Sequence, residues 1–195
     1  MNKIVLATRN KHKIIEIKTI LSDLQLEILT LIDFPNIPLL REDGPTFSDN
    51  SHQKARAVFE LAKLPALADD SGLEVFYLNG RPGVRSARYA GDGATDEENN
   101  EKLLGEMRGV PSRRRKAQFR AVLTLAGEGL REEKVGICEG KLAESPRGSN
   151  GFGYDPIFIP DGSSKTYAEL TAEEKNKISH RAKALAAMKE VLRRQ

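Results

Sequence analysis

The fold of this chain is decided by the stretch Ala66–Gly72, which reads ALADDSG. A short apolar run delivers two adjacent carboxylates, Asp69 and Asp70, and a Ser-Gly pair follows. A strand of an open α/β sheet that ends in this way presents charge beyond its carboxyl end, where ligands of such folds bind. The pattern predicts a strand that ends in a functional turn. The alternative is an Asx turn at Asp70 with no chemical role.

Composition places the chain among ordinary globular proteins. Hydrophobic residues make up 39% and charged residues 30% of its 195 residues, which is neither a disordered nor a membrane composition. We expect a single domain over residues 1–195, with two lobes. The one cysteine, Cys138, excludes an internal disulfide and a Cys-based zinc site. Because cationic residues directly follow the apolar run Ile4–Ala7, no signal peptide is expected, and we predict a cytoplasmic protein without a membrane partner.

The charge balance argues against nucleic acid as a partner. A net charge of +3 is too small to imply it. The only dense basic run, Arg113–Lys116, has no interleaved aromatic residues, so we interpret it as the solvated start of a strand. A nucleic-acid-binding module that uses this run is the alternative from a different class, and it predicts salt-sensitive oligonucleotide binding.

Hydrophobic periodicity predicts an α/β fold with a mixed sheet, because strand and helix patterns alternate and a long hairpin follows them. Capping residues support the helix starts, including a capping box formed by Thr95 and Glu98. The predicted strands are Lys3–Ala7, Leu26–Leu31, the run before Asp69, Leu73–Leu78, and the hairpin Lys116–Ala126 with Glu133–Leu142. The predicted helices run from about 14 to 22, from Asp49 to Lys63, from Thr95 to Met107 and through the C-terminal region.

The loop Thr8–Lys13 follows the first predicted strand and leads into a helix. It places hydroxyl, amide and cationic groups beside the free N–H groups of a helix start, which suits phosphate oxygens. It is not a P-loop, because it contains no glycine. The alternative is ordinary surface charge.

Two later stretches suggest a second binding region. The glycine-rich loop Pro146–Pro156 carries aromatic rings, which predicts a base-stacking platform or, equally, a packed surface loop. Towards the C-terminus, Lys175 and His180 would lie about 140° apart on one straight helix. We therefore predict a break near 176–178, with Ser179 capping the main helix, which lets Lys175, His180 and Arg181 converge on one ligand. A continuous helix would favour a solvated basic face.

Seven short motifs occur in order along nearly the whole chain. They are Thr8, Asn10 and Lys13; Glu42-Asp43-Gly44 with Thr46-Phe47; Asn50, Lys54 and Ala55; Ala68-Asp69-Asp70-Ser71-Gly72-Leu73; Pro82-Gly83 with Ser86-Ala87-Arg88-Tyr89; Gly151-Phe152-Gly153-Tyr154-Asp155-Pro156; and Glu174-Lys175 with Ser179-His180-Arg181. Together they resemble the Ham1-like inosine triphosphate pyrophosphatase family. The chain departs from the family pattern at Arg9 and His12, where glycine is common, and at Ser51, where alanine is usual.

The resemblance implies a mixed α/β fold with an elongated central sheet flanked by helices and two lobes around a cleft, generally as a homodimer. It implies hydrolysis of non-standard purine nucleoside triphosphates (ITP, dITP and XTP) to the monophosphate and pyrophosphate, with Mg²⁺. A rival within the same reaction type is a Maf-like pyrophosphatase acting on pyrimidine nucleotides.

The resemblance also assigns roles to particular residues. Glu42 and Asp70 would hold Mg²⁺, and Asp69 is a candidate for the outer coordination shell of the ion. Asp70 would also be the catalytic base that takes a proton from the attacking water. The phosphates would be bound by Thr8, Arg9, Asn10, Lys11, His12, Lys13, Lys54 and Ser71. The purine would be bound by Phe152, Gly153, Tyr154, Asp155, Lys175, His180 and Arg181, with Phe152 stacking on it and the cationic residues reading its keto oxygen.

Overall fold

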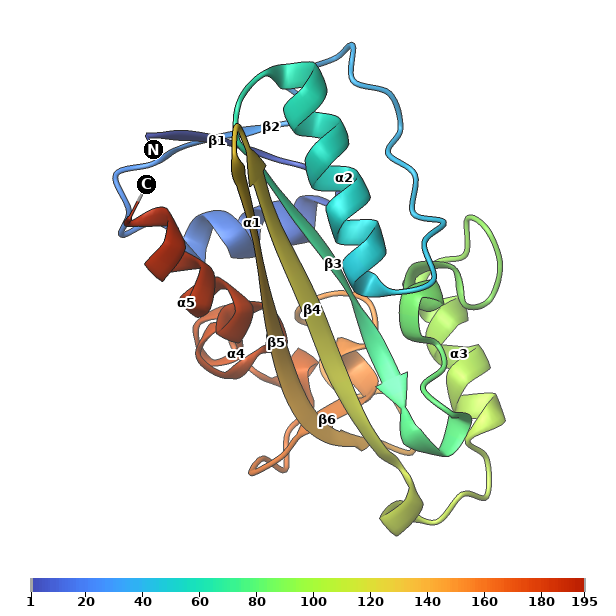
Figure 1. Ribbon diagram of the computed structural model, residues 1–195. Helices are drawn as coiled ribbons and strands as arrows, with labels where there is room; N and C mark the ends of the chain where they lie inside the picture. Colours follow the sequence, from blue (N-terminus) through green and yellow to red (C-terminus); the bar gives the residue numbers. More distant parts are fainter. Residues whose placement is uncertain (1, 195) are drawn as a thin grey trace. The chain divides into compact units, whose positions relative to one another are not determined.

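The computed structural model describes residues 2–194, whose main elements are labelled in Figure 1. The strands are β1 (Lys3–Leu6), β2 (Glu27–Thr30), β3 (Ala66–Val75), β4 (Lys116–Gly127), β5 (Leu130–Leu142) and β6 (Phe158–Pro160). The α-helices are α1 (Lys11–Ile20), α2 (Phe47–Ala62), α3 (Asp96–Glu106), α4 (Ala172–Ile178) and α5 (His180–Leu192). Short 3₁₀ helices include Phe76–Leu78 and Gly83–Arg88.

The strands form one sheet in the order β2-β1-β3-β4-β5-β6. Strand β1 pairs in parallel with both β2 and β3, while β5 and β6 are antiparallel. The sheet is therefore mixed and flanked by helices, which confirms the predicted fold class. Within residues 2–194, no helix is both long and apolar enough to cross a membrane.

The described chain divides into two compact units. The first comprises the chain up to Asp70, Ala121–Gly136, and the chain from Arg181 onward; the second comprises Ser71–Arg120 and Ile137–His180. The strands β3, β4 and β5 contribute residues to both units. The expected single domain, and the cleft between two lobes, stay predictions.

The first unit is layered, with helices on both faces of its strands. Figure 1 shows α1 and α5 on one face and α2 on the other. Because side chains alternate along a strand, Ile4 packs with Ile17 of α1 and Leu185 of α5, whereas its neighbour Val5 packs with Val58 of α2. The two apolar layers hold β1 and β3 at the centre of this unit, which fixes the backbone that carries Asp69 and Asp70.

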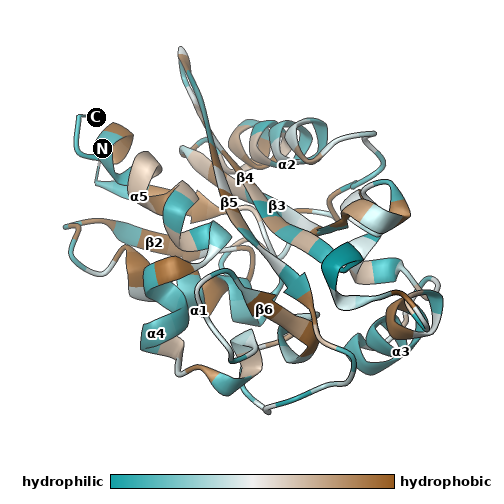
Figure 2. Ribbon diagram, turned by 90° about the horizontal axis from the view of Figure 1, so that it is seen from below, coloured by the Kyte–Doolittle hydropathy of each residue, from teal (hydrophilic) through white to brown (hydrophobic). Residues whose placement is uncertain are grey.

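The second unit has its own core, which is rich in aromatic rings. Strand β6 is hydrophobic along its length in Figure 2, and Phe158 packs edge to face against Phe119 of β4, with ring centroids 4.8 Å apart. The Phe119 ring also stacks with the rings of His180 and Tyr167, whose centroids lie 4.6 Å and 5.7 Å from its own. The His180 ring is thus part of an aromatic stack, and only 3% of the residue is exposed.

Strand β3 corrects the prediction that the chain turns after Asp70. The strand continues through Ser71 and Gly72 to Val75, and the segment Phe76–Leu78 that was predicted as the end of a second strand is a 3₁₀ helix. Gly72 occupies this strand because a Cβ there would lie 2.3 Å from Ser86 Oγ and 2.6 Å from the Gly83 carbonyl oxygen. A glycine that marks close approach of another segment inside a strand looks in sequence like a glycine that marks a turn.

The basic run is also corrected in part. Strand β4 does begin at Lys116, and Arg113 and Arg114 are exposed as expected. Arg115, however, is only 4% exposed, and its guanidinium donates to the backbone carbonyls of Met107, Leu142 and Ala143. One of the four cations is therefore a structural link between backbone segments and not a solvated charge.

The predicted interruption of the C-terminal helical region is confirmed. Helix α4 begins with the capping box of Thr171 and Glu174 and ends at Ile178. Ser179 then adopts an extended conformation (φ −67°, ψ 156°), and α5 begins at His180. The break falls at Ser179, directly after the predicted interval.

The close approach at Gly72 makes a stability prediction. Gly72→Ala places a methyl group against Ser86 and Gly83, so we expect the free energy of unfolding to fall by about 1–3 kcal/mol, as for other overpacked sites. Gly105→Ala in α3 is the matched control, because a Cβ there meets no atom within 4 Å and alanine favours a helix. Urea unfolding of both variants tests this. A Gly72→Ala variant as stable as the wild type would contradict the assignment of Gly72 to a crowded strand.

Candidate active site

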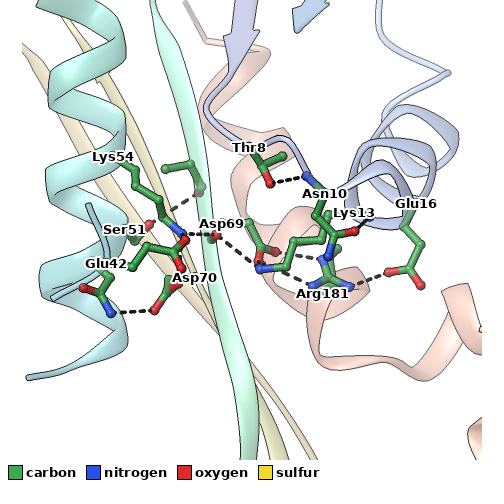
Figure 3. A network of polar contacts seen from close by, with 12 residues as sticks. Thr8, Asn10, Lys13, Glu16, Glu42, Ser51, Lys54, Asp69, Asp70 and Arg181 are labelled. Carbon is green, nitrogen blue, oxygen red and sulfur yellow. Dashed lines mark hydrogen bonds and ion pairs between the residues drawn. The ribbon is translucent and has the colours of Figure 1, made fainter. Parts of the chain in front are cut away.

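Asp69 and Asp70 lie next to each other in β3, and their side chains point to opposite faces of the strand, as alternation requires (Figure 3). Asp70 faces α2, where Lys54 and Asn50 contact it. Asp69 faces the other side, where Arg181 and Lys13 contact it. The two carboxylates therefore do not form one acidic pair, and each has its own cationic partners.

On the Asp70 face, a single ammonium joins two carboxylates from separate parts of the chain. Lys54 Nζ of α2 lies 2.6 Å from Glu42 Oε1 and 2.9 Å from Asp70 Oδ1, and it also donates to the Asp69 carbonyl oxygen at 2.9 Å. The Lys54 side chain is 3% exposed and that of Glu42 is 40% exposed. The structure therefore brings together Glu42, Lys54 and Asp70, as the sequence predicted.

The charges of this face respond to burial and to each other. Burial raises the pKa of Asp70 above its ordinary value, and the nearby Lys54 ammonium opposes this effect without cancelling it. Burial alone would lower the pKa of Lys54, but Asp70 and Glu42 together outweigh it and raise that pKa. Lys54 is consequently held as a cation between the two carboxylates.

Asn50 is a site residue whose role the sequence analysis missed. Its Nδ2 donates to Asp70 Oδ2 at 3.2 Å, and its Oδ1 accepts from the backbone N–H of Gly44 at 2.8 Å. The residue is fully buried, one turn into α2 after the helix cap at Thr46. Asn50 thus ties the Asp70 carboxylate to the loop that carries Glu42. The signal was present, since Asn50 stood in the motif of this helix without an assigned function.

The donor set of the Asp70 face fits a magnesium ion. Mg²⁺ typically takes one or two protein carboxylates and completes its shell with water and phosphate oxygens. Glu42 and Asp70 both touch Lys54 Nζ, so their oxygens are close enough to share one cation. Within residues 2–194 there is no group of three or more His, Cys, Asp or Glu side chains that could hold a metal ion. A cation held by Glu42 and Asp70 would therefore need further oxygens from water or from a ligand.

On the opposite face, Asp69 is the centre of a buried ion network. Arg181 Nε lies 2.8 Å from Asp69 Oδ2, and Arg181 Nη1 lies 2.5 Å from Glu16 Oε2. Lys13 Nζ lies 2.6 Å from Asp69 Oδ1. Burial would raise the pKa of Asp69, but Arg181 and Lys13 hold it well below its ordinary value. Arg181 is 1% exposed, so the structure gives it a buried ion pair in the first unit, and its predicted reading of the base stays a prediction.

Glu16 is the second site residue that the sequence analysis missed. It lies three residues after Lys13 in α1, a spacing that places both side chains on one face of the helix. That spacing could have indicated that Lys13 and Glu16 belong to one cluster of opposite charges. The partner of Glu16, Arg181, is 165 residues away in the sequence, and no local pattern connects them.

The predicted phosphate-binding loop is built around the start of α1. Asn10 is the N-cap, and its side-chain oxygen accepts from the N–H of Lys13, while Thr8 Oγ1 accepts from the N–H of Asn10. Arg9 is turned away to the Ile37 carbonyl oxygen at 2.8 Å. Figure 3 shows Thr8, Asn10 and Lys13 on the same side of β3 as Asp69. Lys11 and His12 are exposed on the first turn of the helix.

The predicted base-binding residues of the second unit come together around one lysine. Lys175 Nζ lies 2.5 Å from Asp155 Oδ2 and 4.9 Å from the centre of the Phe152 ring. Asp155 also accepts from the backbone N–H of Phe152 at 3.0 Å. Phe152 and Gly153 are partly exposed, whereas Tyr154 is buried and donates its hydroxyl hydrogen to the Ser86 carbonyl oxygen. A planar ring, a cation and a carboxylate are thereby presented by one loop and one helix.

Ser71 and His180 are the other predicted substrate contacts of this unit. Ser71 is partly exposed in β3, and His180 lies in the aromatic stack with Phe119. No observation tests the substrate roles of these residues, so they stay predictions, as does the convergence of Lys175, His180 and Arg181.

Fold and site together describe the class of this protein: an α/β protein whose inner strand carries two aspartates, each paired with a lysine on its own face. The chain belongs to the Ham1 family, whose sequence model matches residues 4–191.

Relatives that match this chain over nearly their full length support this membership. The dITP/XTP pyrophosphatase of Geobacter sulfurreducens is 49% identical, covering 98% of this chain and 97% of that protein. The dITP/XTP pyrophosphatase of Shouchella clausii is 45% identical with the same coverage. Among solved structures, a HAM1 protein from Coxiella burnetii superposes with a TM-score of 0.91 at 42% identity and covers 100% of both chains. The Ham1 protein of Staphylococcus aureus gives 0.88 at 38% identity and covers 98% of both.

The Asp69 network makes a pH-dependent stability prediction. Asp69→Asn leaves the buried Arg181 without its main partner, so we expect a loss of about 3–5 kcal/mol in the free energy of unfolding at neutral pH. Because the pKa of Asp69 is lowered in the folded state, its contribution is complete above the unfolded pKa, about 3.9, and is lost as the pH falls below it. The difference between variant and wild type should therefore shrink in acid.

Urea unfolding at pH 7 and at a series of pH values below 4.5 measures this difference. Asp23→Asn is the control, because Asp23 pairs with Lys189 and Arg193 at the surface, where its side chain is 51% exposed. Its effect should be far smaller. A difference for Asp69→Asn that is constant across the pH range would contradict the ion network as the source of stability.

Proposed function

We propose that this protein hydrolyses the non-standard purine nucleoside triphosphates ITP, dITP and XTP to the monophosphate and pyrophosphate, and so removes them from the nucleotide pool. Family membership and full-length relatives that bear the name dITP/XTP pyrophosphatase support an enzyme of this kind. The single structural observation that carries the proposal is the cluster of Glu42, Lys54 and Asp70 on one face of β3. It supplies carboxylates for a metal ion and a cation for phosphate.

The phosphates require positive charge, because a triphosphate carries about four negative charges that oppose attack on phosphorus. We assign this neutralisation to the ammonium groups of Lys13 and Lys54, which contact Asp69 and Asp70 on the two faces of β3. The N-terminus of α1 adds backbone N–H groups, and Thr8 and Asn10 add a hydroxyl and an amide. Backbone groups of Arg9, Lys11 and His12 and the hydroxyl of Ser71 complete the proposed phosphate contacts.

Glu42 and Asp70 would hold Mg²⁺, which when bound neutralises charge on the phosphate oxygens and orients them. Asp70 has a second proposed role, as the base that accepts a proton from the attacking water. Its geometry suits this role, because Asn50 Nδ2 donates to Oδ2 and orients the carboxylate. A carboxylate that is already oriented loses little rotational freedom when it acts.

We propose that selectivity for the base arises from the match between its hydrogen-bond donors and acceptors and those of the protein. Hypoxanthine and xanthine present a keto oxygen where adenine presents an amino group. Lys175 is a donor that can pair with the keto oxygen, and Asp155 is an acceptor for a ring N–H. An adenine facing the same groups would leave a buried donor unpaired, a mismatch that costs about 1–3 kcal/mol. Phe152 would stack on the purine, as the resemblance implies. A homodimer in the cytoplasm likewise stays an expectation from the resemblance.

The experiment that tests the function is release of pyrophosphate across a panel of nucleoside triphosphates with Mg²⁺. We expect kcat/KM for ITP, dITP and XTP to be at least about 10-fold higher than for ATP, because the loss of one hydrogen bond at a buried polar site costs about 1–3 kcal/mol. Excess EDTA should stop the reaction. Preference for uridine or thymidine triphosphate would instead support a Maf-like pyrophosphatase, and salt-sensitive oligonucleotide binding without pyrophosphate release would support a nucleic-acid-binding module.

Asp70→Asn tests the catalytic assignment. The substitution keeps the shape of the side chain and removes the base, so we expect kcat to fall by at least about 100-fold while circular dichroism shows a folded protein. Asp161→Asn, at an exposed aspartate of the second unit, is the control and should keep wild-type kcat. An Asp70→Asn variant with near-normal turnover would remove Asp70 from this role.

A further inference from the structure

Lys54 occupies the space between the two carboxylates that the proposed function assigns to a metal ion. Its Nζ contacts Glu42 Oε1 at 2.6 Å and Asp70 Oδ1 at 2.9 Å. Figure 3 shows the three side chains meeting on one side of β3. Only 3% of the Lys54 side chain is exposed, so solvent does little to screen its charge. The ammonium is a built-in counter-ion for these two carboxylates.

This arrangement sets a conflict between the lysine and a divalent cation. Mg²⁺ requires oxygen ligands at about 2.0–2.1 Å in a nearly octahedral shell. A cation that used both Glu42 and Asp70 would need the space that Lys54 Nζ holds, and two positive charges at such a separation repel each other strongly where the effective dielectric is low. The ammonium must therefore move before both carboxylates can bind the ion.

The displaced ammonium would need another anion. Within residues 2–194, the contact of Lys54 Nζ besides Glu42 and Asp70 is the Asp69 carbonyl oxygen at 2.9 Å, which is a neutral acceptor. The Asp69 carboxylate points to the opposite face of the strand, where Arg181 and Lys13 bind it. A polyphosphate bound between Lys13 and Lys54, which both donate to the Asp69 carbonyl oxygen, would supply the missing negative charge.

We propose that Lys54 makes divalent-metal binding conditional on a polyphosphate ligand: while no phosphate is bound, the lysine neutralises Glu42 and Asp70 and holds the affinity for free metal low. When phosphate oxygens attract the ammonium, the two carboxylates become available for the ion. This inference rests on the proposed function only in taking Glu42 and Asp70 as the metal ligands. It means that metal and nucleotide bind with positive coupling, and such coupling is reciprocal.

Lys18 provides an internal comparison, because it is an exposed lysine of α1 in the same unit, outside the clusters around Asp69 and Asp70. Removal of its charge changes the net charge of the first unit by the same amount as removal of the Lys54 charge. It leaves the contacts of Lys54 with Glu42 and Asp70 in place.

The experiment uses isothermal titration calorimetry to measure binding of Mn²⁺ alone, without nucleotide, to the wild type, Lys54→Gln and Lys18→Gln. We expect Lys54→Gln to bind Mn²⁺ at least 10-fold more tightly than the wild type, although the substitution would also remove a phosphate contact and lower turnover. Lys18→Gln should bind Mn²⁺ within about 3-fold of the wild type, since solvent screens a charge at this exposed position. A Lys54→Gln affinity equal to or weaker than that of the wild type would overturn the proposal.

Two further measurements keep the proposal testable if Lys54→Gln does not fold. Lys54→Arg keeps the charge and should retain the weak Mn²⁺ binding of the wild type, so tight binding by this variant would contradict the proposal. In the wild type labelled with ¹³C-lysine, the Lys54 side-chain resonance, assigned by its loss in Lys54→Arg, should shift when Mg²⁺ and inorganic tripolyphosphate are added together. An unchanged resonance in the metal-bound protein would show that the ammonium does not move.

These results separate this inference from the proposed function. If the wild type releases pyrophosphate from no nucleotide but Lys54→Gln gains Mn²⁺ affinity, the function fails and the role of Lys54 stands. If the nucleotide panel gives the expected activity but Lys54→Gln gains nothing, the function stands and this inference fails.

Discussion

The alternation of side chains along β3 is the constraint on which the site depends. Because successive residues of a strand point to opposite faces, Asp69 and Asp70 enter two different environments although they are neighbours in sequence. Asp69 becomes the buried anion that holds Arg181 and Lys13, and Asp70 becomes the carboxylate that meets Lys54 and Asn50. The same alternation in β1 sends its apolar residues to two separate layers.

The two faces use buried charge in different ways. Around Asp69, the guanidinium of Arg181 joins two carboxylates, and the lowered pKa of Asp69 shows that its ionised form is strongly favoured. Around Asp70, one ammonium is shared by two carboxylates and burial still raises the pKa of Asp70. A fully compensated network stabilises a fold, whereas the Asp70 centre keeps one more carboxylate than cation, and another cation can balance it once Lys54 moves.

Local patterns predicted the local structure. The capping box at Thr95, and a helix break just before the cap at Ser179, were predicted because their causes lie within a few residues of each other. The path of β3 was not predicted. Position 72 requires glycine because the later segment that contains Ser86 packs closely against it, and no local pattern distinguishes such a glycine from one in a turn. The family motifs pointed to Glu42, Lys54 and Asp70, which lie together in the structure, but they could not reveal how these side chains pair. The pairing of Arg181 with Glu16 joins distant parts of the chain and could be seen only in three dimensions.

The most direct test of the account is a crystal structure with Mn²⁺ and a non-hydrolysable deoxyinosine triphosphate analogue, with the metal located by its anomalous scattering. The account predicts an anomalous peak bound by Glu42 and Asp70 on the α2 face of β3, with Lys54 Nζ moved to the phosphate oxygens and the Asp69 and Arg181 ion pair unchanged. A peak on the Asp69 face, or a metal ion bound while Lys54 keeps both of its carboxylate contacts, would contradict it.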